Sequence, residues 1–439
     1  MDIIDAVLHQ SRALDEAIAA AFAAPRYASV EARDRALARQ IAATVLRFGR
    51  PLQTLIDRRL DKPLPTRYAR VAAILLAGAA QLCRLGTPPH AAISLAVEQT
   101  RLARGARHLD KLVNAVLRGL SRDGVILRDS PETVAEAFPD WMRRRWDKAY
   151  GEATAQAIAA ASLHEAALDL SVKAEPARWA ERLGGVALAT GGVRLAAGGR
   201  IEDLEGFAEG HWWVQDAAAA LPARLLGLAL EIAGKEVADL CAAPGGKTAL
   251  LAAAGAGVTA VDISASRLTR VQSNLDRIGL SAELVAADVE SWAPGRQFDA
   301  VLLDAPCTAT GTIRRHPDIL HLKRESDVAQ LAGLQARLLD KAAALVKPGG
   351  TLLYCTCSLE PDEGERQVEA FLAAHREFEV APVAAGESGV EGGWLTPEGF
   401  VRTLPCFTPA PLPGSPAPPT EAPMPSGMDG FFIARLRRH

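Results

Sequence analysis

Two cysteines, each a few residues after an apolar run, are the residues of this sequence best suited to covalent chemistry. Cys307 follows the run Ala-Val-Leu-Leu at 300–303, and Cys357 follows Thr-Leu-Leu at 351–353. Both runs predict buried parallel strands, and side chains that leave the carboxyl ends of such strands line the crevice of an open α/β sheet. Two thiols in one crevice predict attack on an electron-poor carbon, with one thiol attacking and the other assisting release. A single cysteine in such a place is more often a small buried hydrophobic residue, so the neighbouring motifs decide.

A glycine-rich loop follows the first predicted strand of the same region. Its small residues let backbone N–H groups and a helix N-terminus approach an anionic or polar ligand. The residues predicted to bind that ligand are Cys241, Ala242, Ala243, Pro244, Gly245, Gly246 and Lys247. The ending Gly-Lys-Thr also matches a nucleotide-hydrolysing P-loop, but that pattern requires glycine where this chain has Cys241. The sequence therefore argues against a P-loop.

Aspartates end the strands that follow. Asp262 ends the second predicted strand, where it can accept hydrogen bonds from a ribose diol, and Asp288 ends the third, where an adenine amine or a loop amide is in reach. Asp304 ends the fourth strand, three residues before Cys307. Aspartate is also a common helix N-cap, so each residue alone is weak evidence. Together with the glycine loop they predict an adenosine-containing ligand. Dehydrogenases share this geometry but do not need paired cysteines.

The pattern after residue 235 predicts the sheet that positions these residues. Apolar runs alternate with helical segments, at 236–240, 258–263, 283–287, 298–304 and 350–355. That alternation predicts a parallel, doubly wound sheet. A last pair of strands, at 378–381 and 431–436, is expected to close it in the antiparallel sense. Residues 405–430 hold nine prolines and three glycines, which predicts a loop or a disordered insert.

The first 130 residues predict a helical bundle with a basic surface. Apolar residues recur at helical spacing along two faces, 71–82 and 109–120, and the segment 86–90 separates them. Residues 1–130 contain 20 lysines and arginines against 12 acidic residues, whereas the whole chain has a net charge of −3. This asymmetry favours a polyanion as the partner of the first region. Residues 131–235 mix a helix near 141–161 with short strands and glycine turns, which indicates a connecting subdomain.

The length and composition bound the class of protein. A chain of 439 residues predicts two or three domains. The acidic start Met-Asp-Ile-Ile-Asp does not resemble a signal peptide, and no apolar run approaches a membrane span. Six cysteines beside several motifs favour free thiols in a reducing compartment over a disulfide framework. We expect a cytoplasmic monomer.

These motifs together resemble a known family. The run Asp-Ala-Pro-Cys ending at Cys307, the run Thr-Cys-Ser around Cys357 and the loop at 241–247 are similar to the RNA (cytosine-C5) methyltransferases that use S-adenosylmethionine. Residues 311–318 are similar to that family's segment after the first cysteine, and residues 88–92 and 113–118 resemble the NusB-type RNA-binding domain. This combination resembles the bacterial 16S rRNA methyltransferases of the Sun/Fmu (RsmB-like) type. The resemblance covers nearly the whole chain except the proline-rich segment.

The resemblance implies the fold class and the partners. It implies an all-α NusB-like helical bundle over 1–130, a small α+β connecting subdomain over 131–235, and an α/β class I (Rossmann-like) methyltransferase domain over 236–439. S-adenosyl-L-methionine is the implied methyl donor, with no metal, and 16S rRNA is the implied partner, with no membrane.

The resemblance also implies a role for each reacting residue. Cytosine C5 does not accept a methyl group unaided, but a thiolate that adds to C6 converts the ring into an enamine with a nucleophilic C5. By resemblance, Cys357 is this nucleophile, Cys307 assists breakdown of the adduct, and Asp304 orients the base. Lys247 is expected near the reacting groups, and the basic stretch Arg314, Arg315 and His316 is expected to hold phosphates of the displaced nucleotide.

Several alternatives remain open. DNA cytosine methyltransferases use the cysteine of the Pro-Cys pair, here Cys307, so the two thiols could exchange roles, although the Thr-Cys-Ser run favours Cys357. Cys355 departs from the family pattern and could join Cys307 and Cys357 around a soft metal, but no fourth ligand accompanies them. The substrate could be tRNA or another rRNA site. A noncatalytic RNA-binding assembly factor would need neither cysteine.

Overall fold

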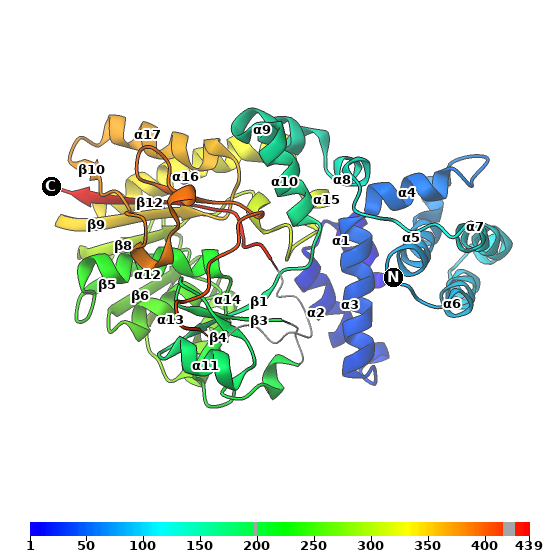
Figure 1. Ribbon diagram of the computed structural model, residues 1–439, viewed down its shortest axis with the longest axis horizontal. Helices are drawn as coiled ribbons and strands as arrows, with labels where there is room; N and C mark the ends of the chain where they lie inside the picture. The colour runs from blue at the N-terminus through cyan, green and yellow to red at the C-terminus, as the bar shows by residue number, and fades with distance from the viewer. Residues whose placement is uncertain (197–199, 416–425) are drawn as a thin grey trace. The chain divides into compact units, whose positions relative to one another are not determined.

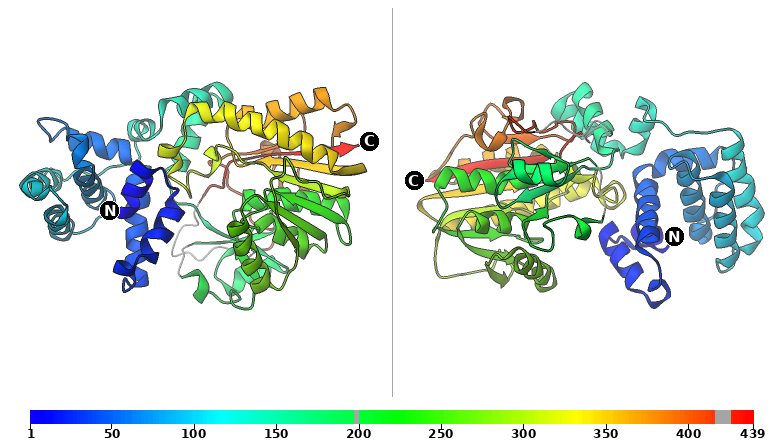
Figure 2. Two further views of the ribbon diagram at one scale, coloured as in Figure 1. Left: turned by 180° about the vertical axis from the view of Figure 1, so that it is seen from behind. Right: turned by 60° about the horizontal axis from the view of Figure 1, so that its bottom comes forward.

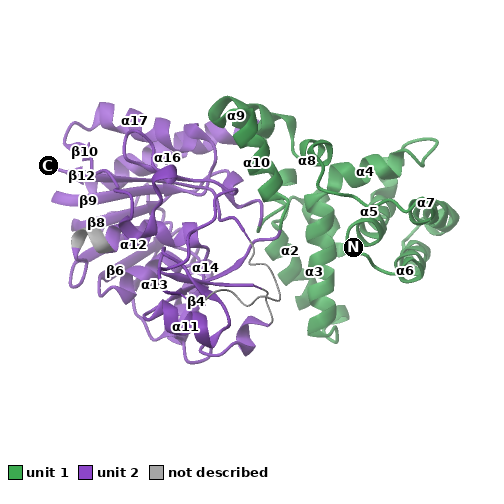
Figure 3. Cartoon of the chain, viewed as in Figure 1, with its two compact units in different colours: residues 1–164, 315–324 green, residues 165–314, 325–439 purple. Residues whose placement is uncertain are grey.

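The protein divides into two compact units. The computed structural model describes residues 1–196, 200–415 and 426–439. Unit 1 consists of Met1–His164 and Arg315–Arg324, and unit 2 consists of Glu165–Arg314 and Glu325–His439 (Figure 3). This division is coarser than the three domains predicted from the sequence, whose boundaries at 130 and 235 stay a prediction.

Unit 1 is entirely helical, which confirms the predicted bundle. Its helices are α1 (Asp2–Gln10), α2 (Leu14–Ala23), α3 (Ala32–Arg47), α4 (Gly49–Asp57), α5 (Ala69–Cys83), α6 (Pro89–Leu102), α7 (Asp110–Arg122), α8 (Pro131–Ala137), α9 (Asp140–Tyr150), α10 (Glu152–Ser162) and α15 (Ile319–Leu322). The single helix predicted near 141–161 is wrong. Gly151 has a φ of 78° and a ψ of 155°, a non-helical conformation open to glycine, and divides it into α9 and α10.

A ten-residue segment, Arg315–Arg324, packs within the helical unit although it follows the first cysteine motif in sequence. The backbone N–H of Leu14 donates to Asp318 Oδ2 at 3.1 Å. The Nε2 atom of His321 lies 2.7 Å from the carbonyl oxygen of Leu46, and burial lowers the pKa of this histidine. The sequence pattern did not predict that this segment belongs to the helical unit.

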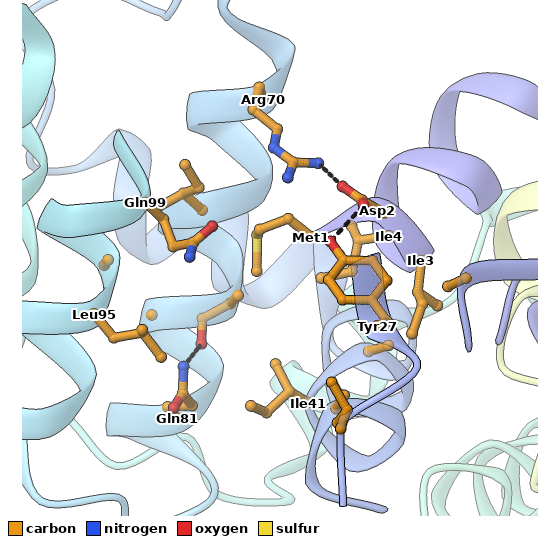
Figure 4. A pocket seen from close by; sticks show the side chains of 18 of the residues that line it. Met1, Asp2, Ile3, Ile4, Tyr27, Ile41, Arg70, Gln81, Leu95 and Gln99 are labelled. Carbon is orange, nitrogen blue, oxygen red and sulfur yellow. Dashed lines mark hydrogen bonds and ion pairs between the residues drawn. The ribbon is translucent and has the colours of Figure 1, made fainter. Parts of the chain in front are cut away.

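The helical unit also contains a cavity of about 280 Å³ with mainly apolar walls (Figure 4). Its polar wall includes Arg70, whose guanidinium lies 2.7 Å from Asp2 and also pairs with Asp5. The positive charge in this wall is therefore already compensated.

Within the described residues, no helix combines the length and apolar character that crossing a bilayer requires.

Unit 2 contains a small and a large sheet. The small antiparallel sheet has the order β2-β3-β1-β4 and carries one helix. Its elements are β1 (Leu168–Val172), α11 (Pro176–Arg182), β2 (Val186–Ala187), β3 (Gly192–Leu195) and β4 (Trp212–Val214). The core of this sheet includes Leu170, Trp179 and Trp212.

The large sheet has eight strands and confirms the predicted doubly wound α/β fold. Its order is β10-β12-β9-β8-β5-β6-β7, with β11 paired to β12. The strands are β5 (Glu236–Leu240), β6 (Gly257–Asp262), β7 (Glu283–Ala286), β8 (Phe298–Asp304), β9 (Val346–Thr356), β10 (Phe378–Val380), β11 (Val401–Thr403) and β12 (Phe431–Arg438). The strands β5 to β9 pair in parallel, and β10 and β12 close the sheet antiparallel, as predicted.

Helices cover both faces of this sheet (Figures 1 and 2). They are α12 (Ala217–Leu230), α13 (Gly246–Ala253), α14 (Ala265–Ile278), α16 (Glu325–Ala344) and α17 (Glu365–Ala374). One core includes side chains from α12, α13 and α14 with Leu302 of β8 and Leu353 of β9, and the other includes α16 and α17 with Leu303 and Leu352. Because neighbours along a strand point to opposite faces, burial on both sides explains the continuous apolar runs.

The chain order makes the carboxyl ends of β5 and β8 a topological switch point. From β5 the chain proceeds to β6 on one side, and it later returns to β8 on the other side. Ligands of open α/β sheets bind at such a point, outside the carboxyl ends of the strands. The glycine-rich loop follows β5, and Asp304 ends β8.

The described part of the proline-rich segment is ordered by backbone pairing. The N–H of Leu412 donates to the carbonyl of Ala187 at 2.7 Å, and the N–H of Ala189 donates to the carbonyl of Ala410 at 2.8 Å. This part is thus an irregular loop joined to β2. Residues 416–425, on which the rest of that prediction falls, lie outside the described residues.

We predict that Asp169→Ala lowers the free energy of unfolding by about 3–5 kcal/mol, because it leaves a buried arginine without its partner. Arg194 donates to Asp169 through Nε at 2.7 Å and through Nη2 at 2.8 Å, with both side chains buried. Urea unfolding followed by circular dichroism measures the loss. Arg178→Ala, at the exposed pair with Glu175, is the control and should cost about 0.5 kcal/mol or less. An equal, small effect of both variants would contradict this account.

Candidate active site at the carboxyl edge of the sheet

The two cysteine motifs meet because β8 and β9 are parallel neighbours. Asp304 stands opposite Cys355 in the register, and the N–H of Ala305 donates to the carbonyl of Cys355 at 3.0 Å. The polypeptide then continues beyond the ends of β8 and β9 to Cys307 and Cys357, respectively. The Sγ atoms of Cys307 and Cys357 lie 3.4 Å apart, and both side chains are partly exposed.

The environment of Cys307 favours its protonated form. The hydrogen bond to Cys357 and burial raise the pKa of Cys307 well above its ordinary value, and the charge of Glu363 acts in the same direction. Cys307 is therefore a thiol at neutral pH, and its S–H can donate to the sulfur of Cys357.

A lysine–aspartate pair lies beside the cysteines. Lys247 Nζ donates to Asp304 Oδ2 at 2.7 Å, and the lysine side chain is 10% exposed. Burial alone would lower the pKa of Lys247, but the charge and hydrogen bond of Asp304, together with the charges of Cys355 and Asp239, outweigh it, so that the pKa is raised. Lys247 is consequently held as a cation, and its Nζ also lies 5.2 Å from the ring centroid of Phe431.

The third cysteine contacts this pair instead of the other two thiols. The Sγ atom of Cys355 donates to Asp304 Oδ1 at 3.6 Å, and its side chain packs into the same core as Cys357, as alternation along β9 predicts. Burial raises the pKa of Cys355 well above its ordinary value. Across the residues that the structure describes, no group of three or more histidine, cysteine or acidic side chains is arranged to hold a metal ion.

The glycine-rich loop leads from β5 directly into α13. Cys241 and Gly245 have positive φ angles of 61° and 95°, and a Cβ at Gly245 would lie 2.8 Å from Val271 Cγ1. Glycine is therefore required at this position. Ala242 and Ala243 are buried, Pro244 is exposed, and Gly246 begins the helix. Burial raises the pKa of the Cys241 thiol to about 12, so it stays protonated.

The aspartate after β6 joins this loop to the following helix. Asp262 is 2% exposed and accepts the N–H groups of Ala243 at 3.1 Å and Ser264 at 2.9 Å. Ser264 caps α14 by accepting the N–H of Arg267. Each carboxylate oxygen keeps further acceptor capacity, so these contacts leave room for a ligand hydroxyl. Next to it, Ile263 is 70% exposed, although isoleucine is usually buried.

The remaining predicted aspartate lies farther along the sheet. Asp288 follows the edge strand β7, is exposed, and accepts the N–H of Glu290 at 3.0 Å through Oδ1. This contact is the local turn that aspartate commonly makes after a strand. The structure thus brings Asp304, Lys247, Cys307 and Cys357 together, and it places Asp262 and Asp288 at the ends of successive outer strands.

The expectation that Arg314 holds phosphates is wrong. Its side chain is only 2% exposed, and its Nη2 donates to the carbonyl of Ser426 at 2.8 Å. Arg315 and His316 belong to the helical unit, where His316 Nδ1 lies 3.8 Å from the carboxylate of Asp15. This run of basic residues includes a buried arginine, which could not be recognised because sequence alone does not show which cations are desolvated.

Comparisons with known proteins agree with both units. The family model described as 16S rRNA methyltransferase RsmB/F matches residues 228–437, and that of the NusB family matches residues 1–122. A protein of Klebsiella pneumoniae named ribosomal RNA small subunit methyltransferase B is 36% identical over 410 residues, covering 89% of this chain and 93% of its own length. The chain belongs to this methyltransferase family. A relative of the same name from Pseudomonas syringae is 40% identical, covering 80% of this chain and 82% of its own.

Solved structures support the fold of this family. A protein described as PH0851 has a TM-score of 0.77 at 23% identity and covers 100% of this chain and 98% of its own. A methyltransferase homologue from Pyrococcus horikoshii has a TM-score of 0.52 at 28% identity and covers 67% of this chain and 94% of its own. Family membership confirms the enzyme class predicted from the motifs, an RNA methyltransferase.

A buried aspartate to which the sequence motifs assign no role leads to a prediction about how stability depends on pH. Asp239 of β5 is fully buried, accepts the hydroxyl of Thr248 at 2.6 Å, and has an Oδ1 with no hydrogen-bond partner among the described residues. Burial raises its pKa to about 7. Between about pH 4 and pH 7 the folded state therefore binds more protons than the unfolded state, and stability falls as the pH rises.

We predict that Asp239→Asn removes this loss. Relative to the variant, the wild-type protein should lose roughly 4 kcal/mol of unfolding free energy across that range, since about three pKa units separate the folded and unfolded groups. Urea unfolding at a series of pH values gives the difference. Parallel stability curves for the two proteins would contradict the assignment.

Proposed function

We propose that this chain transfers a methyl group from S-adenosylmethionine to C5 of a cytosine in 16S rRNA, through a covalent adduct with Cys357. The observation that carries the proposal is the pair of thiols, Cys307 and Cys357, 3.4 Å apart beside the Lys247–Asp304 pair. Methylation of a ribose or of an exocyclic amine requires no second thiol.

The loop after β5 and the aspartates after the outer strands fit the methyl donor. When bound, S-adenosylmethionine supplies an electrophilic methyl group on a sulfonium. Residues 241–247 would surround its amino acid part, Asp262 would accept its ribose hydroxyls, and Asp288 would reach its adenine. The close approach of Gly245 to Val271 and the exposed Ile263 support this assignment, since an apolar side chain at the surface offers a face for a purine.

Cys357 would add to C6 of the cytosine as a thiolate. The new S–C6 bond would make C5 nucleophilic enough to take the methyl group, whose bond to the sulfonium sulfur would break and leave its electron pair on that sulfur. Loss of the C5 proton to a base breaks the C6–S bond, and the electron pair returns to the sulfur of Cys357. The thiol of Cys307 can donate a hydrogen bond to that departing sulfur, which assists release without consuming a proton.

Asp304 would orient the base. Lys247 and Cys355 hold its two oxygens, and its side chain remains 29% exposed at the mouth of the site. A carboxylate fixed in this way can accept a hydrogen bond from the exocyclic amine of cytosine. The base must leave its stack to reach this position.

The helical unit supports an RNA substrate. Residues 1–122 match the NusB family, and the surplus of basic residues within 1–130 suits a phosphate backbone. The named relatives act on small-subunit ribosomal RNA, which favours 16S rRNA over tRNA. We accordingly propose 1–130 as the RNA-binding domain, 131–235 as the connecting subdomain and 236–439 as the catalytic domain. The six cysteines are free thiols, as a cytoplasmic enzyme requires.

We predict opposite outcomes for the two cysteine variants. Cys357→Ala should lower methyl transfer by at least about 10³-fold, because the nucleophile is lost, while the Kd for S-adenosylmethionine stays within about twofold. Cys307→Ala should accumulate a protein–RNA adduct, seen as a shifted band on a denaturing gel. Cys406→Ala, at a cysteine outside the site, is the control and should behave as wild type. An adduct that accumulates in the Cys357 variant instead would reverse the two roles.

The substrate is tested by bisulfite sequencing of RNA from cells with and without this gene. We expect one 16S rRNA cytosine to lose its protection from bisulfite when the gene is deleted, and to regain it when the wild-type gene, but not the Cys357→Ala variant, is restored. Loss of protection only in tRNA or 23S rRNA would contradict the proposed substrate. Unchanged protection in every RNA would contradict cytosine-C5 methylation.

A further inference from the structure

A buried carboxylate joins the two cysteine loops. Glu363 belongs to the 3₁₀ turn Pro361–Glu363, which precedes α17, and its side chain is fully buried. Four hydrogen-bond donors surround its two oxygens. They are the N–H and the hydroxyl of Thr308, the hydroxyl of Ser358 and the side-chain amide of Gln335.

The geometry of these contacts connects the residues next to both thiols. Thr308 follows Cys307, and its N–H donates to Glu363 Oε1 at 2.9 Å. Ser358 follows Cys357, and its hydroxyl donates to Glu363 Oε2 at 2.5 Å. One oxygen of the carboxylate thus accepts the N–H of Thr308, and the other accepts the hydroxyl of Ser358. The carboxylate therefore restrains the residue that follows each cysteine.

Surrounding contacts hold Glu363 in place. Gln335 of α16 donates to Glu363 Oε1 at 3.0 Å and also to the carbonyl of Pro306, just before Cys307, at 2.9 Å. The backbone carbonyl of Glu363 accepts the hydroxyls of Tyr354 at 2.8 Å and Thr356 at 3.1 Å. The network thus includes β9, α16 and the loop after β8, and all of its side chains are buried.

The carboxylate also affects the thiols through its charge. Hydrogen-bond donors stabilise negative charge on this carboxylate, and the buried guanidinium of Arg402 donates to the carbonyl of Ser358 in the same network. Hydrogen bonding to Cys357, burial and the charge of Glu363 raise the pKa of Cys307, whereas a backbone hydrogen bond from Ala309 lowers it. The carboxylate of Glu363 therefore disfavours an anion at Cys307.

We propose that Glu363 is a positioning residue of the methyltransferase site, which sets the separation of the two thiols and disfavours an anion at Cys307. It acts through Thr308 and Ser358 and does not touch the reacting base. This proposal rests on the proposed function for its role in catalysis, whereas its effect on the thiols can be measured without RNA.

The test compares Glu363→Gln with wild type. Glutamine has nearly the same shape, can accept from Thr308 N–H and Gln335 with its oxygen, and can donate to the two hydroxyls with its amide, so the fold should persist. Glu363→Ala removes both connections. Glu369→Gln, at an exposed position of α17, removes the same charge away from the site and serves as the matched control.

The first measurement is the rate at which iodoacetamide alkylates each cysteine as a function of pH, followed by peptide mass spectrometry. For Glu363→Gln we expect the profile of Cys307 to move to lower pH, since a neutral neighbour favours the thiolate. The control should superimpose on wild type. A Cys307 profile unchanged in Glu363→Gln would overturn the proposal, whatever the effect on thermal stability.

The second measurement is catalysis on 16S rRNA. In Glu363→Gln we expect kcat to fall by about tenfold or more while the Kd for S-adenosylmethionine and the KM for RNA stay within about twofold, because only the arrangement of the thiols is altered. Unchanged kcat would also overturn the proposal. If the wild-type enzyme itself fails to methylate cytosine, the proposed function is contradicted, and the alkylation profiles still decide the effect of Glu363 on Cys307.

Discussion

The parallel pairing of β8 with β9 is the constraint on which the site depends. This pairing places Asp304 opposite Cys355 in the register, so each strand delivers one cysteine a few residues beyond the same edge. Two thiols 50 residues apart in sequence thereby come within 3.4 Å without a disulfide. The Glu363 network then restrains the two loops after the strands, where the sheet no longer defines the backbone.

The charges around the edge follow from the same arrangement. Asp239, Asp262 and Asp304 come from the carboxyl ends of three neighbouring strands, and Lys247 pairs with Asp304. The buried Asp239 has the raised pKa expected of a carboxyl group near others in an apolar core. Neutral, charged and thiol groups therefore coexist at one edge, which suits a site that must bind a cationic methyl donor and hold a nucleotide base.

Much of this architecture could be predicted because periodicity and motif spacing are local signals. The runs at 236–240 and 298–304 are the strands β5 and β8, and the run at 350–355 lies within β9. Three features could not be predicted. Gly151 breaks a helix that looked continuous, Arg315–Arg324 packs with distant helices, and Arg314 is buried. Glu363 has no motif of its own, because its partners come from β9, α16 and a loop that only the fold brings together.

The central claim, that Cys357 attacks while Cys307 assists release, can be tested directly with 16S rRNA transcribed with 5-fluorocytidine in place of cytidine. Fluorine at C5 cannot leave as a proton does, so the adduct persists after methyl transfer. Protease digestion and tandem mass spectrometry then identify the modified peptide. The account predicts a methylated fluorocytidine nucleotide on Cys357. The same nucleotide on Cys307, or no adduct in the presence of S-adenosylmethionine, would contradict it.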